Sequence, residues 1–133
     1  MSHFSCIKTK ITDMPPLVEA LNIMGHDPIE AHQIMVVSNE QHAKGHLDVP
    51  VNVTAMDGQI GFKWNSIERC YDLVVDRQTW SQSIPVERFM DKLTQQYARM
   101  SIHQTIKLEG FEVTEEWEME DNSIELMATR WIS

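Results

Sequence analysis

The most informative stretch of the chain is VPVNVTAMDGQIGFKW, residues 49–64. Apolar side chains occupy every second position before and after the Asp57-Gly58 dipeptide, which is the period of a half-buried β-strand. Asp-Gly suits a two-residue type I′ turn, because both central residues of that turn need positive φ. The stretch therefore predicts an antiparallel β-hairpin.

The segments on either side of this hairpin are predicted to form further strands and two helices. A first helix is expected between Asp13 and Gly25, and a longer one between Ser83 and Gly110, because Asp and Ser are good N-caps and glycine is favoured just after a helix end. Strands joined by tight turns favour antiparallel pairing. The order β-α-β-β-β-β-α-β-β thus predicts an α+β fold, with a mostly antiparallel sheet of about six or seven strands and both helices on one face. The other strands are expected at residues 3–11, 33–38, 69–76, 111–119 and 124–132.

Length and composition indicate a soluble globular protein. With 133 residues, the sequence is expected to form a single domain, residues 1–133. It has no apolar run near the roughly 18 residues that span a bilayer, and no apolar segment typical of a secretory signal. We therefore expect a cytoplasmic protein with no membrane partner. The net charge of −9 argues against nucleic acid as a partner, because affinity for phosphates comes from lysine and arginine.

Several segments, taken together, resemble a known family. The chain opens with MSHFSCIKTKITD, continues with IGFKWN and YDLVVDRQTW, and ends with QQYA, GF and a terminal Arg130-Trp131. In this order and spacing they resemble the hypothetical chloroplast reading frame thirty-five family, a Ycf-type domain of unknown function in algal plastids and cyanobacteria. The resemblance covers nearly the whole chain. It implies a small soluble protein of a cyanobacterial cytosol or plastid stroma, or a cyanophage copy of one, and it supplies no catalytic residues.

Acidic side chains are concentrated near the C-terminus, where residues 109–125 hold eight acids and no base. Strict alternation would place Glu112, Glu116 and Glu118 on one side of the strand at 111–119. Such a face could dock a basic protein partner, because complementary charge raises association rates. The alternative is a solvent-facing side that keeps the chain soluble and protects it against edge pairing.

Tryptophans supply the other candidate partner-binding residues. Trp64 and Trp117 fit inward-facing positions and are predicted to lie in the core. Trp80, just before the second helix, could cap the core or anchor a partner. Trp131 lies out of phase with the apolar positions of the last strand, so it would need cover from a helix or from a partner.

Four histidines fall within 21 residues, at His26, His32, His42 and His46. His42 and His46, in EQHAKGH, have the i, i+4 spacing that binds metal when a helix puts both rings on one face. Gly45 lies between them and the surrounding pattern is strand-loop-strand, so a stable helix is not expected. The histidines are therefore either solvated loop residues or a metal site, and this segment departs from the family pattern.

The sequence contains no catalytic motif. GxSxG, a phosphate-binding glycine loop and HExxH are all absent. It therefore favours a non-enzymatic accessory or adaptor protein that acts by protein–protein interaction and needs no cofactor. The alternative is a metal- or small-ligand-binding protein that uses the histidine-rich loop 26–46. The sequence does not predict an oligomeric state.

Overall fold

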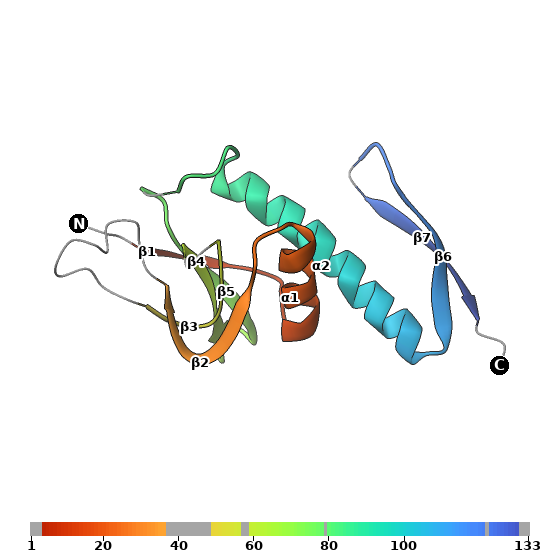
Figure 1. Cartoon of the computed structure of the whole chain (residues 1–133), viewed down its shortest axis with the longest axis horizontal. Helices are drawn as coiled ribbons and strands as arrows, with labels where there is room; N and C mark the ends of the chain where they lie inside the picture. Colours follow the sequence, from red (N-terminus) through yellow and green to blue (C-terminus); the bar gives the residue numbers. More distant parts are fainter. Residues whose placement is uncertain (1–3, 37–48, 57–58, 79, 122, 131–133) are drawn as a thin grey trace.

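The computed structural model shows an α+β fold in which the strands divide between two antiparallel sheets (Figure 1). The strands are β1 (Phe4–Lys8), β2 (Ile29–Val36), β3 (Val49–Ala55), β4 (Ile60–Asn65), β5 (Cys70–Asp76), β6 (Phe111–Glu118) and β7 (Ile124–Arg130). The helices are α1 (Met14–Ile23) and α2 (Val86–Leu108). The structure describes residues 4–36, 49–56, 59–78, 80–121 and 123–130, without the side chains of 31–36 and 49–50.

The predicted class and element order are confirmed, but the strands do not form one continuous sheet. β1 to β5 form a five-stranded sheet in the order β1-β5-β4-β3-β2, and β6 and β7 form a separate two-stranded sheet. All pairs are antiparallel. No helix among the described residues is long and apolar enough to cross a membrane.

The hairpin predicted from residues 49–64 is present as β3 and β4. Val53 lies opposite Phe62, and Ala55 lies opposite Ile60, so the alternating apolar side chains share one face. The N–H of Gln59 donates a hydrogen bond to the carbonyl oxygen of Met56 at 3.1 Å, across the turn. Residues 57 and 58 themselves lie outside the described part of the chain.

Both helices end at the predicted glycines. Gly25 follows α1 with a φ of +80°, and Gly110 follows α2 with a φ of +85°, a conformation that costs glycine little. After α1, the N–H of His26 donates to the carbonyl oxygen of Leu21 at 3.0 Å, which is the long hydrogen bond of a Schellman motif. α2 begins at Val86, a few residues after the predicted start at position 83.

The main core lies between one face of the five-stranded sheet and the two helices, as predicted. α1 and only the first half of α2 contribute to it, since burial along α2 ends at Tyr97. The second half of α2 extends past the sheet and carries β6 and β7 at its far end (Figure 1). The largest fully buried side chains are Phe62, Phe89, Ile11, Leu17, Leu21, Ile60, Leu73, Leu93, Val53, Val74 and Val75.

Candidate functional site

The β6–β7 hairpin, residues 111–130, is the part of the molecule farthest from the main core, and we call it the C-terminal hairpin (Figure 1). It packs against α2. None of its described residues is fully buried. Because an isolated two-stranded hairpin is marginally stable in water, its position depends on its contacts with α2.

A cluster of charged side chains joins this hairpin to α2. Arg99 donates hydrogen bonds from Nε and Nη2 to the two carboxylate oxygens of Glu116, and His103 Nε2 lies 3.1 Å from Glu116 Oε2. The Glu116 side chain is only 19% exposed. Burial opposes its ionisation, but the hydrogen bonds from Arg99 and His103 outweigh burial and hold the pKa of the carboxyl below its ordinary value. The cluster therefore holds a charged carboxylate between strand and helix.

The lowered pKa of Glu116 predicts that acid weakens the attachment of the hairpin. The contribution of Glu116 to stability is complete above its ordinary pKa of 4.5 and is lost as the pH falls from there through the lower folded-state pKa. The free energy of unfolding, measured by urea titration between about pH 3 and 7, should fall more steeply with acid in the wild type than in Glu116→Gln. Equal slopes for the two proteins would contradict this role, because the other carboxylates are common to both.

A β-bulge in β6 sets which side chains face the helix. The ladder pairs Val113 with Ala128 and Glu115 with Met127, so Thr114 is an extra residue without an opposite partner. An extra residue reverses the phase of alternation along the strand. Side chains two, four or six positions apart therefore lie on opposite faces when the bulge falls between them.

The bulge corrects two predictions from strict alternation. Glu116 and Glu118 lie opposite Leu126 and Ile124, on the inner face toward α2, whereas Glu112 lies on the other face. The predicted single row of Glu112, Glu116 and Glu118 is therefore wrong. Trp117 likewise lies on the face opposite to Phe111 and Val113, so it does not point inward as predicted. The predicted role of these acids in partner binding stays a prediction.

The outer face of the hairpin combines acids with partly exposed apolar side chains. Trp117 is 40% exposed, Met119 38% and Met127 49%. Its acids are exposed, and none of its described residues is a base. The outer face consists of Glu115, Trp117, Met119, Glu125, Met127 and Thr129, whereas Glu112 lines a groove beside His103.

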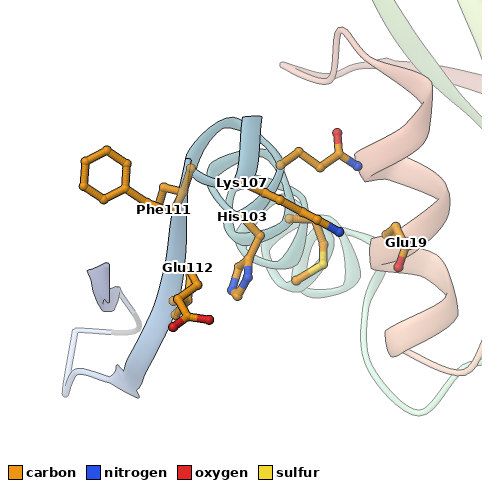
Figure 2. Close-up of a pocket in the computed structure, with 9 residues that line it drawn as sticks. Glu19, His103, Lys107, Phe111 and Glu112 are labelled. Atoms are coloured by element: carbon orange, nitrogen blue, oxygen red, sulfur yellow. The ribbon is translucent and has the colours of Figure 1, made fainter. Parts of the chain in front are cut away.

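Two grooves flank the hairpin where it crosses α2. One, of about 320 Å³, lies between α1, the last turns of α2 and the start of β6 (Figure 2). In it His103 and Glu112 lie on the same side, Lys107 extends toward α1 and Glu19, and the ring of Phe111 points away. The other groove, of about 310 Å³, is lined by residues of α2 and the hairpin that include the apolar Ile102, Ile124 and Leu126. The hairpin thus leaves apolar surface uncovered on both sides.

Comparison with known proteins identifies the family of the chain. A family model described as "Protein of unknown function (DUF1257)" matches residues 20–127. The chain belongs to this family. The match includes β6 and most of β7, so the C-terminal hairpin is part of the family's common domain.

Relatives in the family align with almost the full chain. The uncharacterized protein ycf35 of Pyropia yezoensis is 39% identical over 132 residues, which is 98% of each chain. The proteins of the same name from Guillardia theta and Cyanophora paradoxa are 37% and 32% identical over 131 residues, again 98% of each chain. The resemblance to the reading frame thirty-five family is thereby confirmed. No solved structure matches the chain.

The tryptophans occupy positions different from several of those predicted. Trp80 packs against the core: its Nε1–H donates to the carbonyl oxygen of Ile84 at 2.7 Å, and its ring lies edge-on to Phe89 at 5.5 Å. This placement favours the core-capping alternative over a partner anchor. Trp64, predicted to be core, is 39% exposed near the end of β4. Trp131 lies outside the described residues.

Only one of the four candidate metal-binding histidines has a described side chain. His42 and His46 lie outside the described residues, and for His32 only the backbone is described. The ring of His26 lies edge-on to Phe89 at 5.6 Å, and burial lowers its pKa, partly offset by Asp27. No group of three His, Cys, Asp or Glu side chains within the described part of the chain is placed to hold a metal ion. The metal-binding alternative stays a prediction.

Sequence reasoning missed the residues that hold the hairpin and those that form its outer face. His103 gave no signal, because a lone histidine on a long helix is common. The sequence also did not show that Glu115 and Glu125 lie on the face opposite to Glu116. The apolar residues before and after the bulge keep an even spacing, so they do not indicate the bulge. A bulge is decided by pairing with the other strand, not by the bulged strand alone.

Proposed function

We propose that the chain is a non-enzymatic adaptor whose C-terminal hairpin binds a basic protein partner through its outer face. The observation that carries this proposal is the outer face itself, where Trp117 and Met127 remain exposed between Glu115 and Glu125. We place this role in the cytosol of a cyanobacterium or the stroma of a plastid, as the family resemblance implies.

The chemistry of the outer face fits protein recognition. Tryptophan is enriched among interface residues that contribute most to binding, and methionine adapts its shape to an apolar partner surface. Acids around this centre would speed encounter with lysine- and arginine-rich surfaces and disfavour acidic partners. The second half of α2 would hold this face away from the main core, where a partner could reach it (Figure 1).

The inner acids are less suitable for partner binding than the outer ones. Glu116 is already engaged by Arg99 and His103, so reversing its charge would disturb the hairpin itself. Glu118 lines a groove with Arg88 and Lys92 of α2. The proposal therefore assigns partner contact to the acids on the outer face.

The test is capture of a partner from an extract of the host cell on the immobilised chain. A protein recovered near one-to-one should be lost with Trp117→Ala and with the double charge reversal Glu115→Lys/Glu125→Lys. Removing a central tryptophan costs about 2 kcal/mol or more at an interface, which is a loss of roughly thirtyfold in affinity.

Matched controls come from the start of β2, away from the hairpin. Ile29 is 55% exposed and Glu30 is exposed, so Ile29→Ala and Glu30→Lys change an exposed apolar and an exposed acidic residue without touching the outer face. Both controls should capture the partner as the wild type does. Capture that survives the hairpin variants, or fails equally in the controls, would refute the proposal.

A further inference from the structure

A second exposed apolar surface lies at the turn between β4 and β5. Ile67, at the tip of this turn, is 90% exposed. The turn is nevertheless ordered by its own hydrogen bonds: Asn65 Oδ1 accepts the N–H groups of Ile67 and Glu68, each at 3.1 Å, and Asn65 O accepts the N–H of Arg69 at 2.8 Å. Arg69 has a φ of +57°, which is uncommon for a residue with a side chain. The turn thus presents an isoleucine to solvent in a fixed position.

Basic side chains surround this turn. Lys8 of β1 and Lys63 of β4 both lie opposite Asp72 of β5, one on each side. Lys8 also forms an ion pair with Glu68 at 2.7 Å, so these two charges offset each other. Lys10, Lys63 and Arg69 are exposed and make no ion pair within the described residues. We call this region the β4–β5 corner, formed by Lys8, Lys10, Lys63, Ile67, Glu68, Arg69 and Asp72.

The corner reverses the charge balance of the chain. The whole sequence has 11 bases and 20 acids, yet four of those bases and only two acids lie in the corner. Trp64 is not part of the corner, because it points to the opposite face of the sheet from Lys63 and lies edge-on to Tyr71 at 5.0 Å. The corner therefore offers the apolar side chain of Ile67 within a basic rim.

The outer face of the C-terminal hairpin has the opposite chemistry, apolar side chains within an acidic rim. We propose that the partner of the outer face is the β4–β5 corner of a second copy of this chain, which deepens and rests on the proposed function. Contact between two outer faces, or between two corners, would place like charges against each other. Contact between an outer face and a corner instead brings opposite charges together around apolar side chains. The contact is therefore head-to-tail.

A head-to-tail contact leaves one free surface at each end of a pair. Such contacts form rings or open chains rather than only closed dimers. The mass of the wild-type protein should thus rise with concentration between about 1 µM and 1 mM, the range of weak to moderate protein affinities. Added salt should reduce the association, since the Debye length shortens to about 3 Å at 1 M.

Sedimentation velocity on two complementary variants tests the contact. The hairpin variant, Trp117→Ala/Glu115→Lys, keeps an intact corner, and the corner variant, Ile67→Ala/Lys63→Glu, keeps an intact outer face. Each should remain monomeric alone. Their equimolar mixture should form a dimer and grow no further, because the two surfaces left over are both altered. Ile29→Ala/Glu30→Lys serves as the control and should associate as the wild type does.

Several results would overturn the inference. These are a wild-type protein that stays monomeric over the whole range, association that persists in both variants, or a mixture that forms no dimer when the wild type associates. If the wild type stays monomeric while the hairpin variant loses capture of a host protein, the partner is a different protein and the proposed function stands. If the wild type self-associates independently of Trp117 while host capture is also insensitive to it, both fail.

Discussion

Phe89→Ala is expected to lower the free energy of unfolding by about 3–5 kcal/mol, the usual cost of removing a buried phenylalanine ring. Phe89 is 1% exposed in the first turns of α2. Its ring contacts Trp80 and His26 edge-on, with ring centroids 5.5 and 5.6 Å away. Alanine would leave a cavity where the helix, the segment before it and the end of α1 meet. Urea unfolding should show a lower midpoint with an unchanged slope.

The matched control is Leu108→Ala, on the same helix. Leu108 is 88% exposed, so its truncation should change the free energy of unfolding by no more than about 0.5 kcal/mol. A loss below about 1 kcal/mol for Phe89→Ala would mean that the ring does not fill the core position described. A large loss for Leu108→Ala would mean that the end of α2 is covered in solution.

Arg99→Ala is expected to release the C-terminal hairpin while the main core stays folded. Arg99 supplies two of the hydrogen bonds to Glu116 and is 29% exposed, so solvent screens part of the interaction. We expect the free energy that holds the hairpin against α2 to fall by about 1–3 kcal/mol, because a partly buried carboxylate loses its charged donor. Hydrogen exchange should speed up at the amides of β6 and β7 and stay unchanged in β3 to β5.

Arg77→Ala is the matched control for this experiment. Arg77 pairs with Glu87 at 2.7 Å, but the two side chains are 48% and 67% exposed. An exposed pair contributes little to stability, because solvent screens the two charges. Arg77→Ala should therefore leave exchange in the hairpin at the wild-type rate. Wild-type exchange in Arg99→Ala would show that apolar contacts alone hold the hairpin.

Attachment of the hairpin to α2 and binding of a partner depend on different residues. Glu116 and Arg99 position the hairpin, whereas Trp117 and Glu115 would contact a partner. Substitution of Glu116 or Arg99 should change hydrogen-exchange rates in the free protein. Substitution of Trp117 or Glu115 should change partner binding and leave hydrogen exchange unaltered.

Local sequence determined most of the architecture. Alternating apolar residues around Asp57-Gly58 fixed the β3–β4 hairpin, because side-chain direction in a strand has a period of two. Gly25 and Gly110 ended the helices, because only glycine adopts positive φ there without strain. These features depend on a few neighbouring residues, so they were predictable without the rest of the molecule.

Only the tertiary structure decided how the C-terminal strands face. The bulge at Thr114 is defined by the pairing of β6 with β7, and Glu116 after it contacts Arg99 and His103 on α2. The residues of β7 and α2 lie far from Thr114 in sequence, and the spacing of apolar residues along β6 carries no trace of them. Trp117 was therefore predicted as core and is instead exposed, since a one-residue shift moves every later side chain of a strand to the opposite face.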